Sequence, residues 1–336
     1  MKTLLAAGFA LVLATPAIAQ RTDSYAARPE VRAFIGEMVR QHGFIEGELN
    51  LVFARAQRQE AVLKAIDRPP EQTKSWKEYR AGFLTERRIR AGLQFWNTNR
   101  AALDRATREY GVPGEVIVAI LGVETFYGQR KGRWRVIDSL VTLAFDFPPR
   151  AAYFRTELEH YLLLVRAAGL DVFGVQGSYA GAIGMPQFMP RSHIAYAVDF
   201  DGDGAVNLIS SPVDAIGSIA NFLKQHGWRA GAVVQERAAV RGNDFARYAD
   251  GGVEPRYTLA ELANAGVEQS GEFERVPANT LAALVELPNG NGSSEYRLGF
   301  HNFYVLTRYN RSALYGSVVV DLAAALSAAR LGADPG

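Results

Sequence analysis

The sequence contains no cysteine in its 336 residues. A disulfide framework is therefore excluded, and so is a lipid-modified cysteine behind a leader segment. We expect a protein that is stabilised by the packing of its core rather than by covalent crosslinks. The chain is long enough, and at 48% hydrophobic residues apolar enough, to bury one large core or two to three smaller ones.

Neither sign of charge is in clear excess, since the sequence has 37 Lys and Arg and 35 Asp and Glu. Nucleic-acid-binding proteins show clustered basic residues, whereas here basic and acidic residues are interspersed, as in Glu86-Arg87-Arg88. The glycine patterns of dinucleotide and phosphate loops are missing, and the histidines lack zinc spacing. We therefore expect no nucleic-acid partner and no organic cofactor. The five histidines are His42, His160, His193, His226 and His301.

The first twenty residues have the features of an export signal. Lys2 supplies a positive start, residues 4–18 form an apolar stretch, and Ala17-Ile18-Ala19 matches a cleavage site. The alternative is a membrane anchor, but Pro16 breaks the run, which is shorter than the roughly 20 residues of a spanning helix. The sequence predicts a signal peptide over residues 1–19 and secretion to the periplasm without a membrane anchor. We expect no later segment to cross a bilayer.

Helical spacing of apolar residues dominates the chain from Pro29 to Tyr110. One such stretch, Leu49 to Ile66, is expected to run on as far as Pro69-Pro70, where a helix cannot continue. From about residue 230 to 300, short β-prone runs between glycine-rich turns predict a small β-containing subdomain. Further helices are predicted over Pro113 to Gly128, Tyr153 to Ala168, Pro212 to His226 and Val318 to Leu331. The β-prone runs are Val233-Val234 with Val240, Tyr257 to Leu259, Ala282 to Leu287 and Tyr296 to Leu298.

Glu124 is the first candidate for chemistry, because it lies near the end of a helix that is apolar on every side. Such a helix is buried, and burial raises the pKa of a carboxyl group by disfavouring its charged form. A carboxyl that stays protonated near neutral pH can donate a proton to a leaving oxygen. The alternative is a structural glutamate paired with Arg130 or Arg135.

Residues 199–214 form the second candidate. Acidic residues at positions 1, 3 and 5, with Gly204 at position 6, match a calcium loop of the EF-hand type. The pattern departs at position 12, where Ser210 replaces the bidentate glutamate, so we expect a weak, structural Ca²⁺ site. A solvated acidic turn is the alternative. The predicted ligands are Asp199, Asp201, Asp203, the Ala205 carbonyl and Asp214.

The third candidate is the segment from Gly177 to Pro190, in which small residues would let the backbone approach a ligand closely. Tyr179, Met185 and Phe188 can pack on sugar faces. Ser178 and Gln187 can form hydrogen bonds to a glycan. A glycine-rich structural turn is the alternative for this segment.

Taken together, these segments resemble one family, the lytic murein transglycosylases of type B, which are the soluble form of family 3. The resemblance spans roughly Trp76 to Asn310. Its three main motifs, when they occur together and in this order along the chain, are specific for the family. Weaker similarity covers Ser75 to Tyr79 and Trp96-Asn97. The matching stretches are Ile120 to Gly128, Gly177 to Pro190, Tyr196 to Leu208, Pro212 to Phe222 and His301 to Asn310.

The resemblance implies an α+β fold that is mainly α, with a lysozyme-like core, a helical domain, a small β-containing subdomain and an EF-hand-like calcium loop. The helical domain is expected over residues 20–110, joined by 303–336. The catalytic core is expected over 111–229 with the calcium loop at 199–214, and the β-containing subdomain over 230–302.

The resemblance also implies the activity: cleavage of the MurNAc-β-1,4-GlcNAc bond of peptidoglycan with 1,6-anhydro-MurNAc as the new end. Glu124 is the single acid and base. The expected partner is the glycan strand, and the sequence names no cell-wall enzyme that accompanies it. A lysozyme-type hydrolase and a non-catalytic peptidoglycan- or calcium-binding protein remain alternatives. The glycan contacts carried over from the family are Tyr79, Ser178, Gln187, Phe222, Asn302 and Tyr309.

Overall fold

The computed structural model describes residues 24–67, 73–270, 276–290 and 292–333. The predicted signal peptide lies outside the described residues and stays a prediction. The chain divides into two compact units, residues 1–56 and 57–336. The boundary between them falls inside the helical domain that the sequence predicts for residues 20–110. The finer division of residues 57–336 into a core and flanking domains remains a prediction.

The first unit is a short helical hairpin. A 3₁₀ turn at Tyr25–Ala27 leads into α1 (Pro29–His42), and α2 (Glu46–Arg55) follows. Gly43 ends α1 with a φ of 64°, a left-handed conformation that favours glycine. Helical spacing buries one face of α1, and the ring of Phe34 meets that of Phe53 edge-on at 5.9 Å. The α1 residues on this face are Val31, Phe34, Ile35 and Met38.

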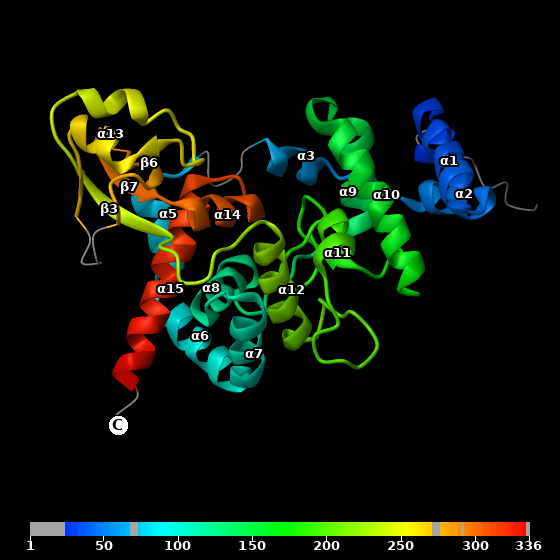
Figure 1. Ribbon diagram of the computed structural model, residues 1–336. Coiled ribbons are helices and arrows are strands. Elements are labelled where there is room, and N and C mark those ends of the chain that lie inside the picture. Colours follow the sequence, from blue (N-terminus) through cyan, green and yellow to red (C-terminus); the bar gives the residue numbers. More distant parts are fainter. Residues whose placement is uncertain (1–23, 68–72, 271–275, 291, 334–336) are drawn as a thin grey trace, which may run out of the picture. The chain divides into compact units, whose positions relative to one another are not determined.

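The second unit is mainly helical, which confirms the predicted fold class. Its helices bring together segments far apart in sequence, and α8 lies alongside α6, α7, α12 and α15 (Figure 1). The helices are α3 (Glu60–Ile66), α5 (Trp76–Phe83), α6 (Glu86–Thr98), α7 (Arg100–Tyr110), α8 (Gly114–Thr125), α9 (Val136–Asp146), α10 (Ala151–Ala167), α11 (Pro190–Tyr196), α12 (Pro212–Gln225), α13 (Leu259–Asn264), α14 (His301–Tyr309) and α15 (Ala313–Ala333).

The expected continuous helix from Leu49 to Ile66 is wrong. The chain leaves α2 at Arg55 and re-enters a helix only at Glu60. The interruption has a physical cause, because the backbone amides of Gln57 and Gln59 donate to side chains of α9 instead of continuing a helical ladder. Gln57 N lies 2.9 Å from Asp138 Oδ1, and Gln59 N lies 3.0 Å from Thr142 Oγ1.

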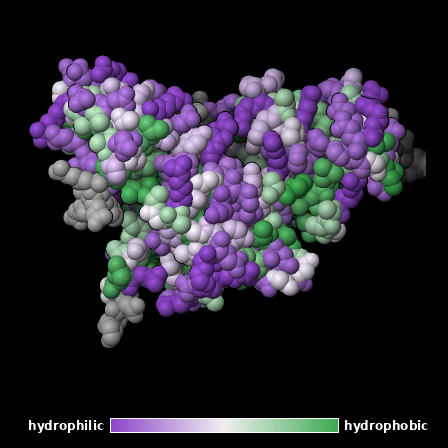
Figure 2. Space-filling model, in the orientation of Figure 1, coloured by the Kyte–Doolittle hydropathy of each residue, from purple (hydrophilic) through white to green (hydrophobic). Residues whose placement is uncertain are grey.

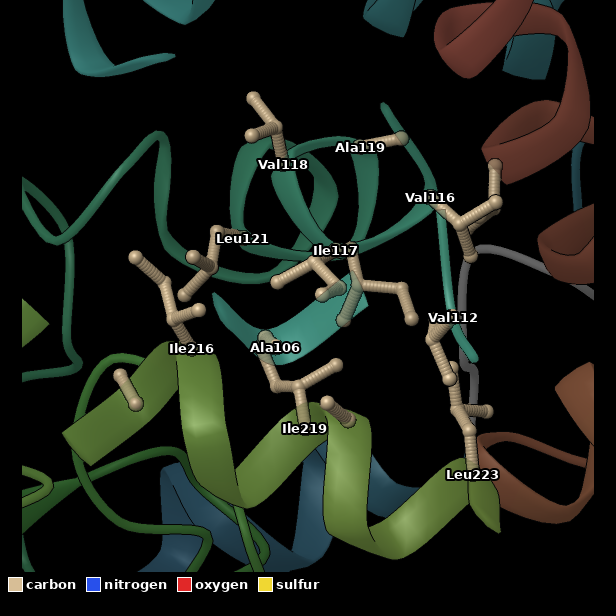
Figure 3. Close-up of a cluster of buried hydrophobic side chains, with 14 of the residues drawn as sticks. Ala106, Val112, Val116, Ile117, Val118, Ala119, Leu121, Ile216, Ile219 and Leu223 are labelled. Atoms are coloured by element: carbon tan, nitrogen blue, oxygen red, sulfur yellow. The ribbon is translucent and has the colours of Figure 1, made fainter. Parts of the chain in front are cut away.

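Helix α8 is buried on all sides, as its apolar sequence predicts. It begins directly after Pro113, as expected, and its residues from Val116 to Leu121 are at most 6% exposed. Figure 3 shows Ile117 pointing toward Ile219 of α12, while Val118 points to the opposite side of the helix. A helix held on every face in this way keeps its last turn, which carries Glu124, in a fixed position.

An antiparallel five-stranded sheet forms the β-containing part, in the order β4-β6-β7-β3-β5. Two expectations differ in detail. Val233-Val234 precede the first strand instead of belonging to it, and Leu259 opens α13 instead of extending a strand. A separate small ladder pairs β1 (Trp134–Arg135) with β2 (Gln176–Gly177). The strands of the large sheet are β3 (Gln235–Val240), β4 (Tyr257–Thr258), β5 (Val267–Gln269), β6 (Leu281–Pro288) and β7 (Ser294–Gly299).

An ion-pair network fastens this sheet to α15. Arg297 of β7 is 3% exposed, and its Nη1 lies 2.7 Å from Asp321 Oδ1 of α15. Arg80 of α5 donates to the same carboxylate, and Arg297 also pairs with Glu295. Burial raises the pKa of Asp321, but the hydrogen bond and charge of Arg297 outweigh burial, so the pKa lies below its usual value.

Helix α15 also corrects an expectation. Its residues 313–332 are long and apolar enough to cross a membrane, whereas the sequence analysis expected no such later segment. The core helix of a folded protein passes the same test of length and composition. Val318, Val319, Leu322 and Leu326 are fully buried, and Asp321 is ion-paired in the middle of the helix. The apolar residues in the first part of α15 therefore lie in the interior of this unit, whereas its last turns are more exposed, with Leu331 78% exposed.

Candidate active site

Glu124 lies half-buried in the last turn of α8, where Oε1 accepts a hydrogen bond of 2.7 Å from the Tyr315 hydroxyl of α15. The helix ends at Thr125, three residues before the predicted end at Gly128. The alternative, a structural ion pair with Arg130 or Arg135, stays a prediction. Arg135 pairs with Asp138 at 2.6 Å, and the guanidinium of Arg130 lies over the ring of Phe126.

The backbone around Glu124 is held by specific contacts. Thr125 Oγ1 donates to the Met185 carbonyl at 2.9 Å and accepts from the Gly128 amide at 2.9 Å. Phe126 and Tyr127 have φ values of 50° and 60°, left-handed conformations that cost about 1–3 kcal/mol each for non-glycine residues. Such conformations persist only where the surroundings hold them, and they often accompany functional sites.

Two tyrosines enclose Glu124 from the α14–α15 side. The Tyr309 hydroxyl donates to the Pro186 carbonyl at 2.6 Å, and the rings of Tyr309 and Tyr315 stack at 6.3 Å. Burial raises the pKa of both phenols well above the usual value, and the charge of Glu124 adds to the shift. Both tyrosines are therefore neutral at pH 7 and keep their protons for donation.

Tyr315 is a site residue that the sequence analysis missed. Its only local signal is a hydroxyl-bearing aromatic residue in the first turn of an otherwise apolar helix. A tyrosine in a core helix is usually explained by packing alone, so the sequence pattern could not single it out.

The aromatic and apolar candidates form a packed layer beneath Tyr309. The rings of Phe222 and Tyr309 lie 4.9 Å apart, and those of Phe188 and Phe222 lie 5.5 Å apart. Met185 is 4% exposed and Phe188 is 2% exposed. Their side chains therefore pack in the interior next to the site and do not present a face to sugars in this structure. Met185 also donates its amide to the Leu208 carbonyl at 2.7 Å.

The polar side chains of the 177–190 segment that were predicted to contact glycan form hydrogen bonds to nearby backbone groups. Ser178 Oγ accepts the Ala182 amide at 3.0 Å. Gln187 Nε2 donates to the carbonyls of Gly184 and Lys131, at 2.8 and 3.2 Å. Both side chains remain half-exposed, as does Tyr179. The segment is thus a braced turn whose polar groups still reach the surface.

The last two predicted glycan contacts lie in different surroundings. Tyr79 of α5 is 3% exposed and its ring lies 5.1 Å from Phe83. Electrostatic interaction with Tyr79 is the smallest of the causes that raise the pKa of Tyr315. Asn302, at the start of α14, is fully buried. Its amide bonds the backbone of Arg229 and the Ala232 carbonyl, so its side chain holds that loop and offers nothing to a ligand.

The acidic loop brings three carboxylates together. One oxygen each from Asp199, Asp201 and Asp214 lies within 4.8 Å of the others. This spacing suits a Ca²⁺ ion, which takes oxygen ligands at about 2.3–2.6 Å. Asp203 is not part of this group, and its Oδ1 accepts the Ala205 amide at 2.9 Å. These three carboxylates therefore fit a calcium ion, and the predicted roles of Asp203 and the Ala205 carbonyl stay predictions.

Backbone amides hold the same carboxylates. Asp199 accepts the amides of residues 202, 203 and 204, and these bonds, chiefly that from Gly204, lower its pKa. Asp214 is fully buried, and it accepts the amides of Phe200 and Asn207 at 2.8 Å each. Asp214 thus ties both ends of the loop to α12 whether or not a metal is bound.

Two surface hollows lie elsewhere. One, of ≈ 800 Å³, is lined by α10, α11 and residues 204–210. Apolar surface gathers over α10 and α11 in Figure 2, where Leu170 and Ile194 are 42% and 49% exposed. The other, of ≈ 980 Å³, lies between the β-containing part and the start of α14. Glu124 lines neither of these two hollows.

Comparison with known proteins agrees with this geometry. The model of the transglycosylase SLT domain family matches residues 26–324. The membrane-bound lytic murein transglycosylase B of Escherichia coli is 40% identical over 323 residues, covering 94% of this chain and 87% of that protein. The crystal structure of the soluble lytic transglycosylase SltB1 from Pseudomonas aeruginosa is 46% identical with a TM-score of 0.83, covering 90% of this chain and 99% of that one.

Two further solved structures carry ligands. The E. coli lytic transglycosylase Slt35 in complex with calcium is 40% identical, covers 91% of this chain and 95% of that one, and has a TM-score of 0.82. SltB3 from P. aeruginosa in complex with NAG-NAM-pentapeptide is 31% identical, covers 89% of this chain and 79% of that one, and has a TM-score of 0.77. The family match, these identities and the shared fold confirm the predicted resemblance: the chain belongs to the lytic murein transglycosylase B family.

Proposed function

We propose that this lytic transglycosylase cleaves the β-1,4 bond between MurNAc and GlcNAc and leaves a 1,6-anhydro-MurNAc end, with Glu124 as its single acid and base. The observation that carries the proposal is the position of Glu124, at the end of a fully buried helix with the Tyr315 hydroxyl 2.7 Å from Oε1. A half-buried carboxyl among neutral aromatic groups is suited to exchange a proton with a sugar oxygen.

Most glycosidases place two carboxyl groups about the scissile bond, and substrate-assisted enzymes are the exception. In the proposed reaction Glu124 protonates the oxygen that leaves with GlcNAc as its bond to C1 of MurNAc breaks. The N-acetyl carbonyl oxygen of MurNAc stabilises the positive centre at C1 from the opposite face. Glu124, now ionised, takes the proton of the MurNAc C6 hydroxyl, whose oxygen bonds to C1. Because the nucleophile belongs to the substrate, it competes effectively with water.

The surrounding residues position the acid. Tyr315 fixes the orientation of Oε1, and the hydrogen bond between Thr125 and the Met185 carbonyl ties the end of α8 to the 177–190 segment. Ser178, Tyr179 and Gln187 on that segment are the half-exposed groups available to the glycan. The SltB3 complex with NAG-NAM-pentapeptide supports a substrate strand that still carries its peptide stems.

Mass spectrometry of digested peptidoglycan tests this proposal. The purified protein should release fragments that end in 1,6-anhydro-MurNAc, one water lighter than the corresponding reducing sugars. Reducing ends alone would identify a lysozyme-type hydrolase. Binding to peptidoglycan without any release of fragments would identify a non-catalytic protein.

We also propose that Asp199, Asp201 and Asp214 hold a structural calcium ion, which would supply positive charge to three converging carboxylates. The structure of Slt35 in complex with calcium supports this assignment. Because Ser210 stands where a bidentate glutamate would complete the site, we expect a dissociation constant on the order of 10⁻⁴ to 10⁻³ M. The loop contacts the active-site segment through the Leu208 carbonyl and the Met185 amide, so its order supports the site indirectly.

A further inference from the structure

Three arginines surround the ring of Phe126, two residues beyond Glu124. The Cζ atoms of Arg87, Arg88 and Arg130 lie 5.4, 5.2 and 5.5 Å from the ring centroid. Each distance is within the range of a cation–π contact. A single such contact is common in proteins, but three guanidinium groups on one ring bring like charges together, and this arrangement needs an explanation.

None of the three arginines has an ion-pair partner among the described carboxylates. Glu86, in the same turn of α6, pairs with Arg90 at 3.9 Å instead. Burial lowers the pKa of Arg88, and the charge of Arg130 lowers it further. The protein therefore keeps three positive charges close together without neutralising them.

Arg88 gives a second, independent observation. Its side chain is 9% exposed, its Nη1 donates to the Gly82 carbonyl at 2.7 Å, and its guanidinium also lies over the ring of Phe83 at 4.7 Å. Its buried Nε has no hydrogen-bond acceptor. A buried donor without an acceptor is rare because it has lost water and gained nothing. Arg87 and Arg130 are exposed, so a ligand can reach the cluster from solvent.

The cluster lies near Glu124 along the chain, because Phe126 is two residues beyond it and the Arg130 amide donates to the Thr125 carbonyl at 2.9 Å. Phe83, which lies under Arg88, packs against the ring of Tyr79 with the two centroids 5.1 Å apart. Helices α6 and α15, which carry Arg88 and Tyr315, both lie alongside α8 (Figure 1). An anion bound by these arginines would therefore lie near Glu124.

We propose that Arg87, Arg88 and Arg130 bind a carboxylate of the peptide stem on the muramic acid near the scissile bond. The proposal rests on the proposed function, because the stem is attached to the muramic acid that Glu124 cleaves. Guanidinium groups match the planar carboxylate and bind it with paired hydrogen bonds. Phosphate has the same charge and similar acceptors, so the experiment must separate the two.

The test compares peptidoglycan strands that carry stems with strands from which an amidase has removed them. Arg87→Gln, Arg130→Gln and the double variant are assayed on both, and the ratio of the two KM values is measured. Wild-type protein should bind stem-bearing strands more tightly. Each single variant should shift the ratio by about threefold and the double variant by about tenfold, because exposed charged contacts contribute modestly. Arg90→Gln, on the same helix but away from Phe126, is the matched control and should leave the ratio unchanged.

Two outcomes would overturn the proposal. A ratio that stays constant in the double variant would show that the arginines do not recognise the stem. Inhibition by millimolar inorganic phosphate that disappears in the double variant, with a wild-type ratio near one, would assign the cluster to a phosphate ligand. Failure of the proposed function is distinguishable, because wild-type protein would then leave both kinds of strand uncleaved. Thermal melting of each variant controls for folding.

Discussion

The molecule holds carboxylates in two contrasting environments. Glu124 accepts a hydrogen bond from the neutral hydroxyl of Tyr315, whose ring stacks with that of Tyr309. Asp199 and Asp214 are surrounded by backbone amides, and each accepts three hydrogen bonds from them. Amide donors stabilise the ionised form strongly, and they hold the pKa of Asp199 below its usual value.

The two environments suit different functions, since one fits the exchange of a proton and the other fits a permanent negative charge. A carboxylate in a nest of amides stays ionised at working pH, so it can attract a cation or hold a loop, but it cannot act as a general acid. At Glu124 the hydrogen bond comes instead from a side-chain hydroxyl. This contrast fits the roles proposed for the two kinds of carboxylate, which are proton exchange at Glu124 and a lasting charge at Asp199.

The largest expected effect tests the aromatic environment. Glu124→Gln keeps the shape and can still accept from Tyr315, but it cannot deliver a proton. General acid catalysis contributes roughly 10²- to 10⁴-fold, so release of 1,6-anhydromuramyl fragments should fall by at least that factor. Binding to peptidoglycan and the melting temperature should be retained. A folded Glu124→Gln protein that cleaves at near wild-type rate would show that another group is the acid.

The second effect tests the amide environment. In Asp214→Asn, an amide nitrogen would face the backbone donors that now reach one carboxylate oxygen. Hydrogen bonds to a buried charged group contribute about 1.5–3 kcal/mol, so the free energy of unfolding should fall by about 3 kcal/mol in urea titrations, even with chelator present.

Asp201→Asn is the matched control for Asp214→Asn, because Asp201 is exposed and accepts only one amide. It should cost little stability in chelator but should abolish the stabilisation that millimolar calcium gives the wild-type protein. If both variants behave alike in chelator, the bracing role of Asp214 is wrong.

The smallest effect concerns a third buried titratable group, His193 of α11. Burial lowers its pKa to about 4, below the unfolded value of about 6.5. The neutral ring therefore favours the folded state above pH 6.5, and this contribution is lost as the pH falls from 6.5 toward 4. Between pH 7 and 5 the wild-type protein should lose about 2 kcal/mol of unfolding free energy through this residue. His193→Gln should lack this part of the pH dependence, and an unchanged urea profile would contradict the assignment.

Local patterns made much of the fold predictable. The buried helix α8 could be predicted from its unbroken apolar run, and the loop at 199–214 from the spacing of its acidic residues. Helix α9 could not, because its buried polar residues Asp138 and Thr142 interrupt the apolar pattern. Their partners are the backbone amides of Gln57 and Gln59, about eighty positions earlier in the sequence. The same contacts explain the unpredicted break between α2 and α3.

The site was predictable where one segment carries it and unpredictable where distant segments meet. Glu124 follows from a single helix, whereas its contact with Tyr315 spans 191 positions. The three arginines around Phe126 come from α6 and from the loop after α8, so the sequence shows them only as ordinary surface charges. Asn302 was expected to contact glycan, and its burial against the Arg229 loop could not be inferred from a motif.

The pairing of Glu124 with Tyr315 also bears on when the protein can become active. During synthesis the acid emerges early and its hydroxyl partner only 191 residues later. Helix α15 also carries Asp321, which holds the sheet through Arg297. A chain that stops short of residue 313 would possess Glu124 but neither its partner nor this anchor. The site of this lytic transglycosylase thus stays unassembled until most of the chain has been synthesised.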